Sequence, residues 1–457
     1  MQPVRRAILK GLAALPFAGA VSFRAAAQTP AVAPDVTDVP PILFVHGNGD
    51  HAALWLTTLW RMESNGVARD RLMALNFTDP LARNDDAVPQ QYRSSTEDAR
   101  RELGEAVAQL KQRTGASRVA LVANSRGGNA LRNYIKNGGG KDVGHAVLCG
   151  TPNHGVHTWP EAPGMEFNGS GPFLRGLIGS DGSEVTEGTA FLTLRSDGMD
   201  KYAQPDGRFL GKPGVATGVT AEGPELRGAT NLVLGPVDHR ETAYHPRAFR
   251  EIYKFIAGRE PQRIAIVPEA QVRLSGLVTG TPGGVPTNRP VADASVEVFR
   301  VAPDSGERIG AALLSARTAA DGRWGPVQVD PTWPLEIVLA QAGAPITHTY
   351  RSPFPRSSEV VHLRAARPLG AADAGAGAVV ILSRARGYFG LPRDVVLFDG
   401  REPADVKPGV PTDTSATLRL AATDVGRPVP ALFNEERIVA RAWPAAENRI
   451  TVAELTY

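Results

Sequence analysis

Cysteine is almost absent from this chain of 457 residues, which contains only one. An internal disulfide is therefore impossible, and the fold must be stabilised by hydrophobic cores. The single thiol, Cys149, ends the apolar run His145–Cys149. A cysteine in such a run is expected to be buried and inert rather than nucleophilic. Long internal repeats and coiled-coil heptads are also missing, so repeat architectures and helical rods are excluded.

The chain also lacks the features of nucleic-acid, nucleotide and metal binding. Its formal charge of +3 comes from residues 1–27, which hold four basic and no acidic residues, so the remainder is nearly neutral. No basic patch with interleaved aromatic residues occurs, and no phosphate-binding loop or dinucleotide fingerprint follows a strand. Five residues are of types that bind metals, but their spacings match no ligand pattern: His46, Asp50, His51, His154 and His157. We expect no metal and no organic cofactor.

Residues 1–27 are predicted to be an export signal of the twin-arginine type. The run Arg5-Arg6-Ala7-Ile8-Leu9-Lys10 resembles the twin-arginine consensus, and Ala25-Ala26-Ala27 offers a cleavage site after a broken apolar stretch. That stretch is too short and too interrupted to span a membrane. Residues 28–40, rich in Ala and Pro, are predicted to be a tether. We therefore expect a periplasmic or secreted protein.

Strands and helices alternate over residues 41–258. Continuous apolar runs such as Ile42–Val45 predict strands that are buried on both faces of a parallel sheet. Ser94 and Glu97 are predicted to form the capping box of a helix that extends to Thr114. The chain is long enough for two or three domains. The first is predicted to be an α/β domain with helices on both faces of a mostly parallel sheet.

The alternation lapses between residues 151 and 189, where the chain is rich in Gly and Pro with isolated apolar residues. An irregular insertion of this length inside a compact domain is usually functional. We predict that residues 151–189 form a cap over the site. Its apolar side chains, which include Trp159 and Phe167, suggest a substrate with an apolar acyl chain.

After residue 258 the period of the apolar residues falls from 3.6 to 2. Val272 and Leu274 begin this alternation, and turn signals such as Asp321-Gly322 recur along the chain. The pattern predicts all-β structure in the C-terminal part. We expect a β-sandwich over residues 271–364 and a second small β unit, or a continuation of the first, over residues 378–457.

The most informative motif is Ala123-Asn124-Ser125-Arg126-Gly127, which follows an apolar strand and precedes a helix. The pattern small-x-Ser-x-small is typical of a sharp turn that lifts a serine hydroxyl clear of the sheet edge. The start of the following helix supplies unpaired N–H groups and partial positive charge, which stabilise an oxyanion. Ser125 is therefore the candidate nucleophile.

A nucleophilic serine needs a histidine base, which in α/β-hydrolases comes late in the domain. His239 follows the predicted strand Asn231–Leu234 and precedes the last helix, which is the position expected of the base. His245 lies nearby, but it directly precedes Pro246 at the start of that helix, where a capping role is expected. We prefer His239 as the base.

The base in turn needs an acid to orient it, and two aspartates follow the predicted strand Ala190–Leu194. Asp200 lies further into the loop than Asp197, and we prefer it for that reason alone, with Asp197 as the alternative. Asp238, which is adjacent to the histidine, is interpreted as a turn residue.

Two backbone N–H groups are needed to bind the oxyanion of an acyl-transfer intermediate. One is expected from Arg126, the residue after the nucleophile, and the other from Asn48 in the loop after the first strand. The flanking glycines, Gly47 and Gly49, let the backbone approach closely. His46 is expected to brace this loop rather than to act in catalysis.

In this order, the strand at residues 42–45, the loop His46-Gly47-Asn48-Gly49, Ser125, the acid loop and His239 resemble those of α/β-hydrolase lipases and esterases. The chain is similar to bacterial lipases with an Ala-x-Ser-x-Gly turn, and to archaeal carboxylesterase-lipases with a C-terminal β-rich, lipid-binding domain. The stretches Val119–Tyr134 and Ala229–Pro261 carry this resemblance. It implies an α/β-hydrolase fold and an ester hydrolase without a cofactor.

The chain departs from the archaeal lipases at two positions. They take their acid from the strand after the turn helix, where this chain has Gly150. The position of the acid in this chain, after the next strand, is therefore inferred from the wider family. The run Asn124-Ser125-Arg126 replaces their usual His-Ser-Met, which leaves the role of the Arg126 side chain open. Farther on, residues 271–364 resemble carboxypeptidase-regulatory or transthyretin-like β-sandwiches, through Pro290–Val298 and Thr318–Trp324.

These observations predict an exported serine ester hydrolase that acts on carboxylic esters with apolar acyl chains, as a lipase or carboxylesterase. An extracellular polyester depolymerase is the alternative, since export and accessory β structure also suit an insoluble polymer, and the residues alone leave amide or thioester hydrolysis open. A rival of another class is a non-catalytic surface-binding protein on a hydrolase fold. Contact with a lipid or polymer surface, through the cap and the β structure, is a further expectation.

Overall fold

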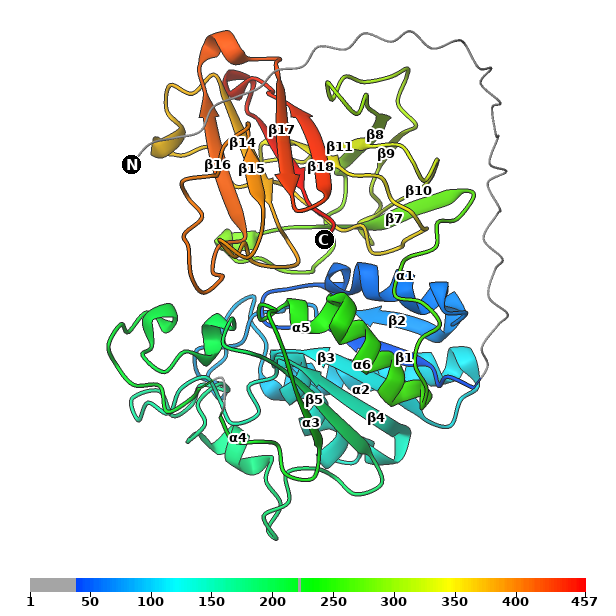
Figure 1. Ribbon diagram of the computed structural model, residues 1–457, viewed down its shortest axis with the longest axis vertical. Coiled ribbons are helices and arrows are strands. Elements are labelled where there is room, and N and C mark those ends of the chain that lie inside the picture. The colour runs from blue at the N-terminus through cyan, green and yellow to red at the C-terminus, as the bar shows by residue number, and fades with distance from the viewer. Residues whose placement is uncertain (1–37, 221–222) are drawn as a thin grey trace, which may run out of the picture. The chain divides into compact units, whose positions relative to one another are not determined.

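The computed structural model describes residues 38–220 and 223–457 (Figure 1). The predicted export signal and nearly all of the predicted tether lie outside the described residues. Within the described ranges, no helix is both long enough and apolar enough to cross a membrane.

A six-stranded parallel sheet forms the first part of the fold. Its order is β2-β1-β3-β4-β5-β6, and every neighbouring pair is parallel. The strands are β1 (Ile42–Val45), β2 (Leu72–Leu75), β3 (Val119–Asn124), β4 (Val143–Cys149), β5 (Ala190–Ser196) and β6 (Thr230–Leu234). The apolar runs at β1, β3 and the end of β4 are fully buried, because helices cover both faces of the sheet.

Two hydrophobic cores lie on the two faces of this sheet. One contains Ile42 and Phe44 of β1 and is covered by α1 (Leu56–Ser64) and α6 (Pro246–Ala257). The other contains the alternate residues of the same strand and is covered by α2 (Thr96–Thr114) and α3 (Arg126–Lys136). Each fully buried aliphatic or aromatic side chain contributes roughly 1.5–3 kcal/mol to folding, so both cores fix the strand ends that carry the site.

The capping box of α2 lies one residue later than the sequence predicts. Ser95 is the N-cap, its side chain accepts a hydrogen bond from the amide of Asp98, and the Asp98 carboxylate accepts one from the Ser95 amide. The predicted cap, Ser94, is used otherwise, since its hydroxyl donates to the carbonyl of Asp79 and accepts from Arg126. The register of the cap is thus decided by a tertiary contact.

The segment between β4 and β5 is irregular, as predicted. Within the described chain, the segment has one α-helical turn, α4 (Pro172–Gly176). Three apolar side chains of the segment, Trp159, Leu174 and Leu177, are buried. A further short helix, α5 (Glu241–Tyr244), lies later in the chain and directly precedes α6.

The C-terminal part is built of strands only, apart from short 3₁₀ turns. A three-stranded sheet, β10-β7-β13, and four strands of a larger sheet, β12-β11-β8-β9, enclose one core. These strands are β7 (Val272–Thr279), β8 (Ser295–Arg300), β9 (Leu314–Arg317), β10 (Arg323–Val329), β11 (Leu335–Ala340), β12 (Ile346–Arg351) and β13 (Leu363–Arg364).

The remaining strands are divided between the larger sheet, which they continue, and a separate sheet, and the sequence left both arrangements open. β14, β16 and β19 extend the larger sheet to seven strands in the order β16-β14-β19-β12-β11-β8-β9, and β15, β17 and β18 form a separate sheet. β19 lies between β12 and β14 and is parallel to both, so it pairs what would otherwise be an exposed edge. The bounds are β14 (Ala378–Ser383), β15 (Val396–Phe398), β16 (Ser415–Leu420), β17 (Pro428–Phe433), β18 (Glu436–Arg441) and β19 (Arg449–Glu454).

Candidate active site

Ser125 occupies the sharp turn between β3 and α3. Its backbone has φ 53° and ψ −124°, a left-handed region that a residue with a side chain rarely adopts and that marks stored strain. Glycines surround the turn because the loop after β1 approaches it closely. A Cβ on Gly127 would lie 2.5 Å from the carbonyl oxygen of His46, and one on Gly47 would lie 2.9 Å from the Cβ of Ser125.

His239 and Asp200 lie on the loops after β6 and β5 and contact each other. His239 Nδ1 donates a hydrogen bond to Asp200 Oδ2 at 2.7 Å, and both side chains are buried. The other Asp200 oxygen accepts from the amide of Tyr202, which fixes the carboxylate. This arrangement leaves His239 Nε2 without the proton and able to accept one.

Asp197 takes a different position. Its carboxylate packs against Gly235, where an added Cβ would lie 2.3 Å from Asp197 Oδ2, and it makes no hydrogen bond to His239 among the described residues. Of the two aspartates that the sequence left open, Asp200 is the one that reaches the histidine.

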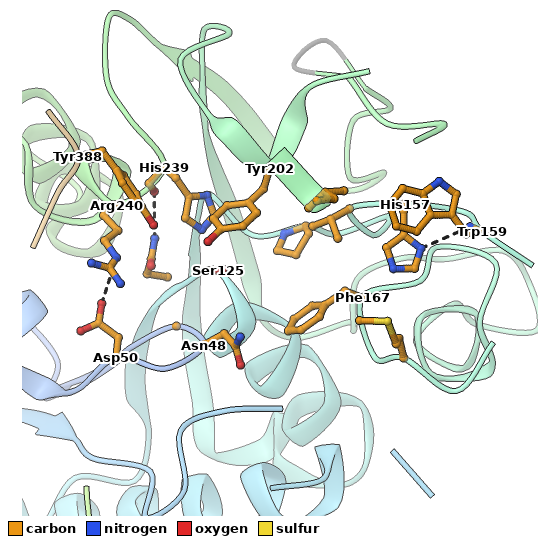
Figure 2. A pocket seen from close by; sticks show the side chains of 16 residues that line it. Asn48, Asp50, Ser125, His157, Trp159, Phe167, Tyr202, His239, Arg240 and Tyr388 are labelled. Atoms are coloured by element: carbon orange, nitrogen blue, oxygen red, sulfur yellow. Dashed lines mark hydrogen bonds and ion pairs between the residues drawn. The ribbon is translucent and has the colours of Figure 1, made fainter. Parts of the chain in front are cut away.

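Ser125 and His239 line the same pocket, which has a volume of about 340 Å³ (Figure 2). No hydrogen bond joins the two side chains in this structure, and such bonds are often loose before substrate binds. On one side of Ser125 the pocket is apolar, with Trp159 and Phe167 of the irregular segment. Other apolar lining residues are Val156, Met165 and Leu210.

The opposite side of the pocket is polar, and the sequence did not indicate that Arg240 and Tyr388 lie there. Figure 2 shows Asp50, Arg240 and Tyr388 there, with Arg240 Nε 3.5 Å from Asp50 Oδ2. Tyr202 lies edge-on to His239, with ring centroids 4.7 Å apart. Tyr202 is only two positions from Asp200, so the sequence places it near the site. No residue close to Tyr388 in the sequence links it to the site.

Asn48 lines the pocket, and Arg126 directly follows Ser125, which also lines it. Arg126 is the first residue of α3, so its N–H has no partner within the helix. Within residues 38–220 and 223–457, neither amide hydrogen-bonds to another protein group. The Asn48 side chain accepts from the amide of Ala82 at 2.8 Å, which fixes the loop rather than contacting substrate.

His46 braces the same loop. Its Nδ1–H donates to the carbonyl of Gly47 at 2.8 Å, and its Nε2 accepts from the amide of Phe77 at 3.1 Å. Burial lowers the pKa of His46 to about 4, so the ring is neutral at pH 7, as these two hydrogen bonds require.

The Arg126 side chain is not among the residues that line the pocket, and its guanidinium is fully paired. Its guanidinium donates to both carboxylate oxygens of Glu166 at 2.8 and 2.9 Å, and to Pro80 and Ser94. Arg126 is 1% and Glu166 3% exposed, and burial raises the pKa of Glu166 against the opposing effect of Arg126. The side chain whose role the sequence left open therefore ties the nucleophile turn to the irregular segment.

The remaining candidate residues, His245, Asp238 and Cys149, have structural rather than catalytic roles. His245 caps α6, where its side chain accepts from the amide of Arg247. Asp238 accepts from two amides of its own turn, as predicted, but it also pairs with Arg384 at 2.9 Å, which the sequence did not indicate. Cys149 is buried in the sheet, and burial raises the pKa of its thiol.

Two family models match this chain. The model for palmitoyl protein thioesterase matches residues 41–192, which include β1 to β4, the Ser125 turn and the irregular segment. The model for the lipase C-terminal domain matches residues 270–368, which include β7 to β13.

Three solved structures illustrate the similarity of the fold. A *Bacillus licheniformis* lipase, BlEst2, is 18% identical, covers 50% of this chain and 96% of its own, and gives a TM-score of 0.36. Lipase B of *Aspergillus fumigatus* is 17% identical, with coverage of 50% and 55% and a TM-score of 0.37. Phospholipase PlaB of *Legionella pneumophila* is 13% identical, with coverage of 72% and 94% and a TM-score of 0.33.

The parallel sheet, the strained serine turn and the two family matches agree with one another. The chain is an α/β-hydrolase of the lipase and esterase type with a β-rich C-terminal part, and its enzyme class is that of the ester hydrolases.

Proposed function

We propose that the protein is an exported serine ester hydrolase, with Ser125 as nucleophile, His239 as base and Asp200 as the acid that orients the base. The observation that carries this proposal is the hydrogen bond of 2.7 Å between His239 Nδ1 and Asp200. Ser125, on its strained turn, lines the same pocket as His239. A serine hydroxyl becomes a useful nucleophile only beside such a base.

The reaction follows from this geometry. Ser125 Oγ attacks the ester carbonyl, and its proton passes to His239 Nε2 while Asp200 stabilises the imidazolium. The amides of Asn48 and Arg126 hold the oxyanion. The C–O bond to the alcohol then breaks and His239 gives the alcohol its proton, which leaves an acyl-enzyme on Ser125. Water, deprotonated by His239, attacks this ester, and the acid leaves as the serine regains its proton.

The substrate we propose is a carboxylic ester with an apolar acyl chain. Support comes from the side of the pocket formed by Val156, Trp159, Met165 and Phe167, where an alkyl chain would be buried and gain about 0.8 kcal/mol for each methylene. No metal or organic cofactor takes part in the steps above.

A second candidate is the hydrolysis of acyl thioesters. The observation that favours it is the match of residues 41–192 to the palmitoyl protein thioesterase model. The same nucleophile, base and oxyanion donors serve both reactions, because a thioester also passes through a tetrahedral oxyanion.

Export is supported by the sequence alone, through the twin-arginine pattern at Arg5–Lys10. If the proposal is right, the protein expressed in its full length is cleaved near residue 27 and found outside the cytoplasm. An Arg5→Lys, Arg6→Lys double variant that is still exported and cleaved would contradict the twin-arginine route.

The activity is tested with two matched series of substrates, p-nitrophenyl esters and coenzyme A thioesters, each from two-carbon to sixteen-carbon acyl chains. Ser125→Ala serves as the blank. We expect ester hydrolysis that depends on Ser125 and rises with acyl length until the pocket is filled. Thioester turnover above ester turnover at equal chain length would favour the second candidate, and no turnover above the blank in either series would refute both.

A further inference from the structure

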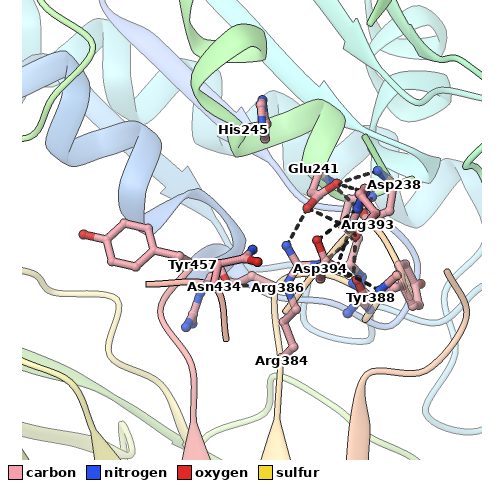
Figure 3. Close-up of polar contacts among 12 residues, drawn as sticks. Asp238, Glu241, His245, Arg384, Arg386, Tyr388, Arg393, Asp394, Asn434 and Tyr457 are labelled. Carbon is pink, nitrogen blue, oxygen red and sulfur yellow. Dashed lines mark hydrogen bonds and ion pairs between the residues drawn. The ribbon is translucent and has the colours of Figure 1, made fainter. Parts of the chain in front are cut away.

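The segment Arg384–Asp394, between β14 and β15, packs against the loop that carries His239 (Figure 3). Arg384 donates to Asp238 at 2.9 Å and to Glu241 at 2.5 Å, so it holds the residues on both sides of the histidine. This segment lies beyond residue 368, where the second family match ends.

Two further groups of the segment join the same carboxylates. The amide of Tyr388 donates to Asp238 at 2.8 Å, and Arg393 donates to Glu241 at 2.7 Å. Asp238 is fully buried and Arg384 is 2% exposed. Buried charges are tolerated only with such complete pairing, so the His239 loop in this conformation depends on the segment.

The segment also contacts the loop that carries Asp200. The ammonium group of Lys201 lies 4.2 Å from the centre of the Tyr388 ring. Arg240, the residue after His239, donates to the carbonyl of Ala385 at 2.9 Å. The acid and the base are thus both followed in sequence by a cation that contacts this segment.

Tyr388 is also part of the pocket itself. Its ring lines the polar side of the pocket beside Arg240 and Asp50, away from Trp159 and Phe167 (Figure 2). With an acyl chain on the apolar side and the carbonyl at Ser125, the alcohol part of an ester would lie on the side of Tyr388.

We infer that the segment Arg384–Asp394 completes the active site from the C-terminal β structure. Arg384 is a positioning residue that acts on His239 through Asp238 and Glu241. Tyr388 is a specificity-determining residue that contacts the alcohol part of the ester. This inference rests on the proposed function of the same pocket.

The positioning role is tested with Arg384→Lys in the full-length protein, which keeps the charge but loses the fork that spans two carboxylates. The matched control is Arg308→Lys, which alters an arginine bonded at 2.6 Å to the buried Glu336 within the β structure. We measure kcat and KM for p-nitrophenyl butyrate, the rate of inactivation by diethyl p-nitrophenyl phosphate, and the melting temperature.

In Arg384→Lys, kcat and the inactivation rate are expected to fall together by about 10- to 100-fold, because both need a correctly placed base, while KM changes less than about twofold. Arg308→Lys is expected to keep both rates within about twofold. A folded Arg384→Lys protein with wild-type kcat and inactivation rate overturns the positioning role. If it does not fold, Asp238→Asn, which changes the same cluster with little change of shape, replaces it under the same criteria.

The specificity role is tested with Tyr388→Ala on two series of esters. One series varies the alcohol of a butyrate ester (ethyl, glyceryl, naphthyl), and the other varies the acyl chain of a p-nitrophenyl ester. We expect the relative kcat/KM values to change by about tenfold in the alcohol series and to keep their order in the acyl series. An unchanged order in both series overturns this role.

These outcomes are separable from failure of the proposed function. Wild-type protein that the phosphate ester does not inactivate would contradict the serine hydrolase itself. Wild-type protein that is inactivated, together with variants that behave like it, would contradict only the role of the segment.

Discussion

The two sides of the candidate site are fixed by contacts of very different range. On the serine side, the strained turn at Ser125 packs against the loop after β1, and Arg126, next to Ser125, binds Glu166 forty residues later. On the histidine side, the residues that flank His239 bind Arg384, more than 140 residues later. The nucleophile is therefore positioned by contacts within the α/β part of the chain, whereas the base also depends on the C-terminal β structure.

The largest expected effect is on kcat, and it differs between the two aspartates near the histidine. Asp200→Asn removes the charge that orients His239 and stabilises its imidazolium, so kcat should fall by about 10⁴-fold. Asp197→Asn changes a carboxylate three residues away that does not reach the histidine, and kcat should stay within about twofold. Equal losses in the two variants, measured with one ester, would show that the histidine side is organised differently.

On the serine side, the buried pair of Arg126 and Glu166 should contribute much more than an exposed pair. Glu166→Leu leaves the Arg126 guanidinium buried without its carboxylate and is expected to cost about 3–5 kcal/mol of unfolding free energy. The control, Glu97→Leu, breaks an exposed pair with Arg100 and should cost about 0–1 kcal/mol. Urea unfolding measures both, and similar costs would mean that Arg126 finds another partner.

The close approach at the serine turn can be tested by a single methyl group. Gly127→Ala places a Cβ 2.5 Å from a backbone oxygen and is expected to cost about 1–3 kcal/mol and to reduce activity. Gly176→Ala, in α4, adds the same methyl where no atom lies within 4 Å, and should be neutral or slightly stabilising. An active Gly127→Ala protein of wild-type stability would show that the turn relaxes easily.

The smallest effect, taken per pH unit, is the pH dependence of stability that His46 gives to the loop that carries Asn48. The folded pKa of His46, about 4, lies below its unfolded value of 6.5, so the unfolded chain takes up the proton first as the pH falls. The stability contributed by neutral His46 is complete above pH 6.5 and is lost between pH 6.5 and about 4, by up to about 1.4 kcal/mol per pH unit. His46→Gln should show a flatter decline in urea unfolding over this range, and an identical slope would contradict this account.

The same contrast explains what the sequence could and could not predict. The strands of the parallel sheet, the Ser125 turn and the loop at Asn48 follow from apolar runs and small residues close together in the chain. The sequence predicts the capping serine of α2 one residue too early, because the Ser94 hydroxyl accepts a hydrogen bond from Arg126 instead of capping the helix.

Features that join distant segments had no such signal. Nothing in the run around Tyr388 indicates that it lines a pocket with His239, and the alternation of β19 does not reveal that it lies between β12 and β14. The choice between Asp197 and Asp200 likewise needed the loops in space, since both follow the same strand.

The most direct test of the account is the intact mass of the protein after treatment with a fluorophosphonate, followed by peptide mapping. We expect one covalent adduct, located on Ser125, in the wild-type protein and none in Ser125→Ala. An adduct on another residue, or no adduct on the wild-type protein, would contradict the assignment of Ser125 as the nucleophile of a serine hydrolase.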